Sequence, residues 1–404
     1  MADFTSIAAT PSVDYTVVGA GPAGLCAIAK LLSLGTSPNH IAWIDPVFRM
    51  GDFGSTLSVG SSIPSNTTVK NFQQVNQAIY ASIPTVAPSV EEEEQLTITQ
   101  LSPSGHCSLK IAAEPMQRMS NAFRQLVRTY QGTVVNIREL QSSACLEIDI
   151  QQGKHLLRLL SARVILATGA KPKAFSFQPP FPLTTIPLNT AMIASELYTY
   201  LKTRISPETV SKVVVVGSSH SAALAVMNLL REGIAVKQLM NKPYRFAVAR
   251  RTADGVAYTQ FDNTGLKGEA AAYIQELLAS AENNSQSNPL PWENHIYAPS
   301  SPLSEKDHRY LEGQLQGCSH IVAAIGYEHL ATLTINGLPL HCYSHNSQNT
   351  QIGNISGLFG LGIAFPQKVQ SPSGEIEAAV GYSKFWATVN HPLVVDAWQS
   401  AGAL

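Results

Sequence analysis

The stretch DYTVVGAGPAGLCAIAKLLSLGTSPNHIAWID, residues 14–45, decides the fold. A short β-branched strand leads into the glycine pattern of residues 19–24, then into an alanine- and leucine-rich helical pattern, and then into a second strand that ends on Asp45. This order predicts a βαβ unit that binds a dinucleotide, because a helix N-terminus offers N–H groups and a positive dipole to phosphate. A glycine-rich turn in an ordinary α/β protein is the alternative, and the complete order of elements favours the dinucleotide site.

Each residue type in this unit has a task. Gly19 makes the tight turn, Gly21 lets the backbone approach the pyrophosphate, and Gly24 lets helix and strand pack closely. Asp45 is expected to bind the ribose hydroxyls; it follows Gly19 by 26 residues, and the loop at 35–40 makes this interval longer than the usual ~20. The predicted cofactor contacts in this unit are Gly19, Gly21, Pro22, Ala23, Gly24, Asp45 and Pro46.

The composition indicates a globular chain long enough for two or three domains. It has 404 residues, of which 45% are hydrophobic and 14% charged, and its formal net charge is −1. No basic stripe points to nucleic acid, and no apolar run approaches the ~20 residues of a membrane span. The N-terminal MADFTSIAATPS has an acid where a secretory signal would carry lysine or arginine, so a cytoplasmic protein is expected.

The cysteines and histidines give no sign of a metal centre. The five cysteines are scattered without a CxxC pair, so disulfides, a zinc site and a redox dithiol are poorly supported. The eleven histidines form no HExxH pattern, and no metal is expected. Cys26, inside the first predicted helix, is expected to be buried packing.

Residues 163–170, RVILATGA, are the second landmark. An apolar strand ends here on Ala-Thr-Gly, where only a glycine-sized residue lets the backbone lie against a ligand. Thr168 and Gly169 are therefore predicted to contact the first dinucleotide. The five prolines in residues 171–188 then predict an extended connector and a domain boundary.

Residues 211–230, SKVVVVGSSHSAALAVMNLL, repeat the opening order of strand, tight turn and helix. Gly217 follows Gly19 by 198 residues, and small residues replace the second and third glycines. Their serine hydroxyls add donors for phosphate. A structural hydrogen-bonding role is the alternative for the histidine of this turn. The predicted contacts with a second dinucleotide are Gly217, Ser218, Ser219, His220 and Ser221.

The residues after this second helix complete the repeat. The strand at 235–240 is followed by Lys242 and Arg245, cations that suit the 2′-phosphate of NADP, although basic residues on an exposed loop are an alternative. Residues 320–327, HIVAAIGY, mirror RVILATGA, with Gly326 as the closing glycine. The segment GLFGLG, with Gly360, Leu361 and Gly362 as predicted cofactor contacts, precedes a helix predicted over 374–389.

The region between the first two landmarks predicts a helix over 112–130 and strands over 132–137, 144–150 and 156–160. These strands suggest an antiparallel layer that crosses the sheet, with Val135 as a further cofactor contact. The loop that follows Asp45 is rich in glycine and serine and is expected to enclose a ligand, most specifically at Ser65, Asn66 and Thr67.

The expected fold class is therefore α/β, with two Rossmann-like three-layer (β/β/α) dinucleotide-binding domains, one inserted into the other. Residues 1–185 are predicted to form the first part of an FAD-binding domain, with an insertion at about 69–160. Residues 186–335 would form an NAD(P)H-binding domain, and residues 336–404 would return to the FAD-binding domain.

These motifs resemble the flavoprotein superfamily with two dinucleotide-binding domains, and within it the class B flavin monooxygenases and the lysine or ornithine N-hydroxylases. The resemblance implies FAD and NADPH as cofactors. It also implies O₂ as co-substrate and oxygen transfer through a C4a-(hydro)peroxyflavin to a small nitrogen or sulfur nucleophile. Ser65-Asn66 is similar to the family's Ser/Thr-Asn pair over the flavin, which makes Asn66 the catalytic candidate near C4a. Two departures are the missing FxGxxxH fingerprint between residues 171 and 212 and the two lost glycines of the second motif.

Other functions stay open at this stage. The chain could be an FAD-dependent NAD(P)H reductase or dehydrogenase without oxygen transfer. It could also be a flavin-binding sensor or interaction module with a degenerate second half. A homo-oligomer is possible, and the sequence does not identify the substrate.

Overall fold

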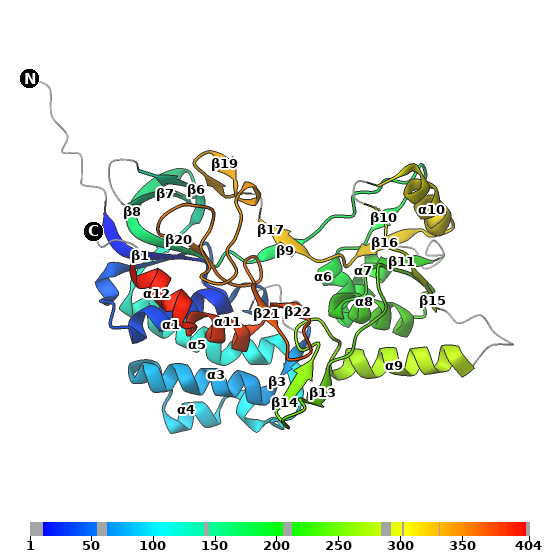
Figure 1. Ribbon diagram of the computed structural model, residues 1–404, viewed down its shortest axis with the longest axis horizontal. Helices are drawn as coiled ribbons and strands as arrows, with labels where there is room; N and C mark the ends of the chain where they lie inside the picture. Colours follow the sequence, from blue (N-terminus) through cyan, green and yellow to red (C-terminus); the bar gives the residue numbers. More distant parts are fainter. Residues whose placement is uncertain are drawn as a thin grey trace, which may run out of the picture.

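The structure is a computed structural model that describes residues 11–54, 63–140, 145–204, 212–283, 292–300, 303–330 and 332–400. Within these residues the chain forms two α/β units that are joined by a two-stranded ribbon (Figure 1). The architecture is the predicted one, with parallel sheets and covering helices of the Rossmann type.

The larger unit is built on a mixed sheet in the order β19-β18-β6-β7-β8-β1-β2-β5, with β20 also paired to β8. Strands β8, β1, β2 and β5 run parallel, and so does β20 beside β8, so their carboxyl ends share one edge of the sheet. The strands are β1 (Ser12–Val18), β2 (Ile41–Asp45), β5 (Arg128–Gln131), β6 (Thr133–Glu139), β7 (Leu146–Gln152), β8 (His155–Leu166), β18 (Thr334–Ile335), β19 (Leu338–Pro339) and β20 (Leu358–Gly360).

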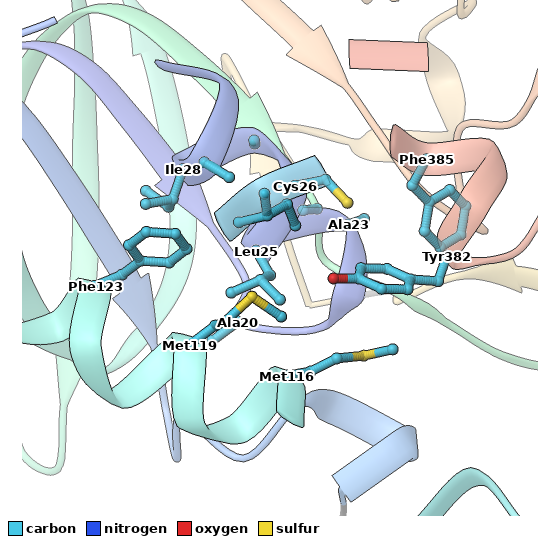
Figure 2. Packing of buried hydrophobic residues seen from close by; sticks show 14 of the residues in the cluster. Ala20, Ala23, Leu25, Cys26, Ile28, Met116, Met119, Phe123, Tyr382 and Phe385 are labelled. Atoms are coloured by element: carbon cyan, nitrogen blue, oxygen red, sulfur yellow. The ribbon is translucent and has the colours of Figure 1, made fainter. Parts of the chain in front are cut away.

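Helices cover one side of the parallel strands, and the antiparallel strands β6 and β7, which continue the same sheet from β8, lie on the side away from these helices (Figure 1). Leu25 and Ile28 of the first helix pack with Met119 and Phe123 of the fifth, and all four side chains are fully or almost fully buried (Figure 2). The helices of this unit are α1 (Pro22–Ser33), α2 (Gly51–Gly54), α3 (Val69–Ser82), α4 (Val90–Glu94), α5 (Leu109–Leu126), α11 (Tyr382–Val389) and α12 (Pro392–Ser400).

The smaller unit repeats the arrangement on a parallel sheet in the order β10-β16-β11-β12-β15. The central order β16-β11-β12 matches β8-β1-β2 of the larger unit, which confirms the predicted sequence repeat as a structural one. Its strands are β10 (Thr184–Thr185), β11 (Val213–Val216), β12 (Val236–Met240), β15 (Trp292–Ile296) and β16 (His320–Ala323), with a separate hairpin of β13 (Val248–Arg251) and β14 (Ala257–Gln260). Its helices are α6 (Leu188–Met192), α7 (Ala194–Arg204), α8 (His220–Arg231), α9 (Gly268–Asn283) and α10 (Glu305–Leu315).

Two crossing segments join the units. Strand β9 (Ala170–Pro172) leaves the larger unit and pairs antiparallel with β17 (Tyr327–His329), which returns from the smaller one. The amide of Lys173 also donates to the carbonyl of Gly326 at 3.0 Å. The connectors that follow the two strand-closing glycines therefore support each other between the sheets.

The structure corrects three element boundaries. The predicted strand over 156–160 and the one that precedes Thr168 are a single strand, β8, which pairs antiparallel with β7 in its first half and parallel with β1 in its second. The predicted helix over 112–130 ends at Leu126, because Arg128–Gln131 pairs with the edge of β2. The predicted C-terminal helix starts at Tyr382 rather than near 374. The residues before it form a hairpin of β21 (Gln367–Gln370) and β22 (Ile376–Ala379), whose turn contains Gly374 at a φ of 88°.

Candidate functional site

The glycine turn after β1 is too crowded for side chains at two of its three glycines. A Cβ on Gly19, which has a φ of 107°, would lie 2.3 Å from the carbonyl oxygen of Ala167. A Cβ on Gly24 would lie 1.9 Å from the carbonyl oxygen of Gly19. Among the described residues, a Cβ on Gly21 would meet nothing within 4 Å, so they leave this side of the turn open. Helix α1 begins there at Pro22 without a side-chain cap, which leaves its first N–H groups available to a ligand.

Two further predicted segments lie against this turn. The amide of Leu361 donates to Leu166 at 2.9 Å, and a Cβ on Gly362 would lie 2.9 Å from the Cβ of Ala23. At the end of β8, the buried hydroxyl of Thr168 has no hydrogen-bond partner among the described residues. Gly169 follows with a φ of 69° and open space beside it. The structure thus gathers the glycine turn, Thr168-Gly169 and residues 360–362 at the carboxyl edge of the larger sheet.

Asp45 has a structural task that the sequence does not predict. One carboxylate oxygen accepts from the amide of Ala20 at 2.7 Å, and the other accepts from Val47 and Phe48 at 2.8 and 2.6 Å. A carboxylate has about four lone-pair sites, so capacity for a ribose hydroxyl remains. Asp45 therefore holds the glycine turn and the following loop together, whatever else it binds.

The loop after Asp45 bends back toward the glycine turn. Phe48 and Met50 have φ values of 54° and 52°, and Gly51 follows at 53°. A Cβ on Gly51 would lie 3.6 Å from the Cα of Gly21. The predicted contact Pro46 lies at the start of this loop, and its carbonyl accepts from Gln131 at 3.1 Å.

The predicted flavin-facing segment lies in β3 (Pro64–Thr68), which pairs with β4 (His106–Ser108). The register slips between Pro64 and Thr68, so Ser65, Asn66 and Thr67 bulge from the ladder. Ser65 is 4% exposed, and its hydroxyl donates to the carbonyl of Thr67 at 2.6 Å. The side chain of Asn66 lies outside the described part of the structure, so its catalytic role stays a prediction.

Val135 occupies a second bulge. The β6–β7 register shifts between Val134 and Asn136, which frees the backbone of Val135 from the regular ladder. Its carbonyl accepts from the hydroxyl of Thr334 at 3.2 Å. Bulges of this kind change the direction of local groups. This one lies shortly after Gly132, whose amide donates to the backbone carbonyl of Asp45 at 3.1 Å.

The smaller unit reproduces the first turn almost bond for bond. Gly217 has a φ of 131°, and a Cβ there would lie 2.2 Å from the carbonyl oxygen of Ala324. Its amide donates to Leu239 at 2.8 Å, as that of Gly19 donates to Ile44 at 2.8 Å. The predicted contacts beside it lie at the start of α8: Ser218 and the N-cap Ser219, which makes no side-chain cap bond, and then His220 and Ser221 in the first turn.

One device in both turns was missed by the sequence analysis. The third residue of β2, Trp43, donates from its indole to the carbonyl of Gly19 at 2.9 Å. The third residue of β12, Gln238, donates in the same way to Gly217 at 2.8 Å. Gln238 is fully buried and also bonds the hydroxyl of Tyr244 at 2.6 Å. Burial raises the pKa of Tyr244 well above its ordinary value, so this phenol stays neutral. Aligning the two halves strand by strand would have exposed these equivalent positions.

The predicted 2′-phosphate cations lie on the loop beyond β12. Lys242 and Arg245 are both exposed, and the guanidinium carbon of Arg245 lies 4.9 Å from the ring centroid of Phe261. Tyr244, through Gln238, ties this loop to Gly217. Gly326 has a φ of 96° and open space around it at the start of the returning ribbon.

The described residues also bear on metals and membranes. No group of three or more His, Cys, Asp or Glu side chains among them could hold a metal ion. Within the same residues, no helix combines the length and apolar character needed to cross a bilayer.

Comparison with known proteins agrees with this geometry. The chain is 31% identical to "Monooxygenase AgnR1" of Paecilomyces divaricatus over 404 aligned residues, which cover 95% of this chain and 97% of the relative. No family model matches the chain.

The fold is that of several solved enzymes. The FAD-bound cadaverine monooxygenase DfoA of Erwinia amylovora is 13% identical, with a TM-score of 0.59 over 97% of this chain and 95% of that one. The L-lysine 6-monooxygenase of Pseudomonas syringae is also 13% identical, with a TM-score of 0.57 over 97% of this chain and 100% of its own. The bacillithiol disulfide reductase of Staphylococcus aureus has a TM-score of 0.53 at 10% identity, over 98% and 100% of the chains. These likenesses establish the architecture.

Proposed function

We propose that this chain, which belongs to the flavin-dependent monooxygenases with two dinucleotide-binding domains, binds FAD in its larger unit and NADPH in its smaller one. It would use both to transfer one oxygen atom from O₂ to a small nitrogen or sulfur nucleophile. In this division the first domain part ends near residue 185, the inserted domain near 335, and the rest returns to the FAD domain.

The observation that carries the proposal is a duplicated turn, which we call a cradle. In the larger unit the cradle is the turn at Gly19 with the start of α1, and in the smaller unit it is the turn at Gly217 with the start of α8. In each unit a glycine with positive φ presses against a neighbouring strand, at Ala167 in one and Ala324 in the other. In each unit a side chain of the second strand fixes that glycine's carbonyl, and the helix that follows has an uncapped N-terminus. Two such cradles suit two dinucleotides, because each offers open backbone amides to a pyrophosphate.

The larger cradle fits FAD by its own donor set. The open side of Gly21 and the first turn of α1 would receive the pyrophosphate, and Asp45 would receive the ribose. The hydroxyl of Thr168, which has no partner in the described part of the chain, offers a hydrogen bond at the same edge. The bulged segment Ser65–Thr67 would face the flavin ring. Bound and reduced, FAD supplies the activation of O₂ that no protein side chain provides.

The smaller cradle would bind NADPH through the serines around Gly217, with Lys242 and Arg245 turning toward the 2′-phosphate. The protein's part is to hold the two dinucleotides in fixed relation and to exclude water from the reacting atoms. The buried core of the larger unit, with fully buried Ile28 and Phe123 behind the turn, gives the FAD side a rigid support.

The test is anaerobic reduction of the purified yellow protein with NADPH and, separately, with NADH, followed by ¹⁸O₂ and a panel of small amines and thioethers. We expect faster bleaching with NADPH and ¹⁸O in a product. Bleaching with hydrogen peroxide as the sole oxygen product would support a reductase instead. No bleaching by either coenzyme would refute the role of the smaller unit.

A further inference from the structure

The turn-rich segment 261–268, FDNTGLKG, has no part in either cradle, yet it lies where the two units meet. It follows β14 and opens α9 in the smaller unit. In Figure 1, β13 and β14 lie beside β21 and β22 of the larger unit. Leu266 is 1% exposed within the smaller core, and its amide donates to Arg245 at 2.8 Å. The segment is therefore fixed to the smaller unit and directed at the larger one.

Glu377 of β22 receives this segment. The carboxylate accepts from the amides of Asn263 and Thr264 at 3.2 and 3.1 Å, and from the hydroxyl of Thr264. Glu377 is only 4% exposed, and these three donors come from the other unit. Because a buried carboxylate without donors is costly, the geometry of Glu377 depends on the docked segment.

A second acid of this contact, Asp262, lies on the segment itself and contacts the larger unit. Asp262 accepts from Lys267 of its own unit at 2.7 Å and from Lys384 of α11 in the larger unit. Lys384 lies in the first turn of α11, where the positive end of the helix dipole disfavours a cation. The Asp262 carboxylate compensates for this placement. Nearby, Gln260 donates to Glu375 at 2.8 Å, which extends the same contact.

The larger-unit side of the contact leads directly to the first cradle. Helix α11 packs on α1, the helix that starts at the glycine turn. Tyr382, the first residue of α11, is 1% exposed and donates to Asn76 of α3 at 3.1 Å. Figure 2 shows Tyr382 and Phe385 of α11 facing Ala23 and Cys26 of α1. A displacement of the segment would therefore be transmitted to the support of the FAD turn.

From these contacts we propose that Glu377 is the positioning residue of an inter-unit clamp, with the Asp262–Lys384 pair as its second element. The clamp holds the NADPH-binding unit in one orientation relative to the FAD-binding unit. The proposal rests on the proposed function for its consequence, hydride transfer from NADPH to FAD, but the clamp itself is a property of the chain alone. Glu377 acts on the orientation of the units through its bonds to Asn263 and Thr264.

The first test is hydrogen exchange in the protein as purified, without NADPH. Glu377→Gln replaces one charged acceptor with an NH₂ group that faces N–H donors. We expect exchange of the Asn263 and Thr264 amides to accelerate about tenfold, since hydrogen bonds to a carboxylate are roughly twice as strong as neutral ones. Glu276→Gln, an exposed acid on α9 of the same unit, is the matched control and should change neither amide. Unchanged exchange at both amides in Glu377→Gln would overturn the clamp.

The second test separates position from folding. Lys384→Met removes the inter-unit ion pair, whereas Lys267→Met removes the pair within the smaller unit. We expect Glu377→Gln and Lys384→Met to slow anaerobic flavin reduction at saturating NADPH about tenfold. The FAD content of the protein and its affinity for NADPH should stay unchanged. Lys267→Met should slow it less than Lys384→Met. Equal rates in all variants would refute the positioning role. A parent protein that no coenzyme reduces would refute the proposed function while leaving the exchange result standing.

Discussion

Replacing Gly217 by alanine tests the second cradle at its tightest point. The new Cβ would lie 2.2 Å from the carbonyl oxygen and 2.9 Å from the carbonyl carbon of Ala324, at a φ of 131°. A non-glycine residue in such a conformation costs roughly 1–3 kcal/mol, and overpacking adds about 1–3 kcal/mol. Their sum is on the order of 2–6 kcal/mol. If the backbone around Gly217 relaxes and opens the turn, the amides at the start of α8 no longer point at the phosphate. The affinity for NADP⁺ should then fall at least about tenfold.

The assay is calorimetric titration of NADP⁺ into the FAD-loaded protein, with the unfolding free energy measured on the same samples. Gly233→Ala is the matched control, because Gly233 also has a positive φ, 75°, but its Cβ would meet nothing within 4 Å. In Gly233→Ala the unfolding free energy should fall only by the cost of the backbone conformation, and the affinity for NADP⁺ should be retained. FAD content should stay unchanged in both variants, because Gly19 forms the other cradle. Parent-like NADP⁺ affinity in Gly217→Ala would refute the assignment of this turn to the coenzyme.

Three further outcomes follow from single side chains. Trp43→Phe removes the indole bond to Gly19 and should lower the unfolding free energy by about 1 kcal/mol and weaken FAD retention; undiminished FAD content after dialysis would contradict this. Burial raises the pKa of the Cys26 thiol, whereas Cys342 is exposed, so a thiol reagent at pH 8 should label Cys342 first in the native protein; equal labelling of both would be inconsistent with the structure. Burial alone would raise the pKa of Asp262, but its two lysine partners bring it below its ordinary 3.8. The carboxylate's contribution should therefore be complete at neutral pH and be lost as the pH falls below about 3.8, so the stability gap between the parent and Asp262→Asn should narrow on acidification. If the stability difference between the parent and Asp262→Asn widens instead, the ion pairs of Asp262 with Lys267 and Lys384 do not stabilise the fold.

The sequence predicts the two cradles because their signals are local. Strand, turn and helix follow one another within about 20 residues, and a glycine with positive φ leaves its mark in the residue type itself. The closing strands before Thr168 and Gly326 are recognisable for the same reason. By contrast, the bonds from Trp43 and Gln238 join residues whose types have many other uses, and they become visible only when the two units are superimposed.

Long-range contacts explain the boundary errors. Arg128–Gln131 continues a helical pattern, yet pairing with β2 is available at that edge and takes the chain out of the helix. In the hairpin before α11, the alternation of polar and apolar residues is too short to predict a strand. Its Glu377 meets donors 113 and 114 positions away. The sequence near β22 therefore does not predict its contact with residues 261–268, and the sequence near those residues does not predict it either.

The two cradles differ at the position of the third glycine, which the repeat makes comparable. In the larger unit the third glycine of the motif, Gly24, cannot be replaced without a shift, because a Cβ there would lie 1.9 Å from the carbonyl oxygen of Gly19. In the smaller unit the same place holds Ala222, which is fully buried, so this position accommodates a methyl group. A closer helix brings its N-terminal amides nearer to the pyrophosphate. We therefore expect the larger cradle to hold its dinucleotide more closely, as a resident cofactor requires, and the smaller one to suit a coenzyme that must leave after each turnover.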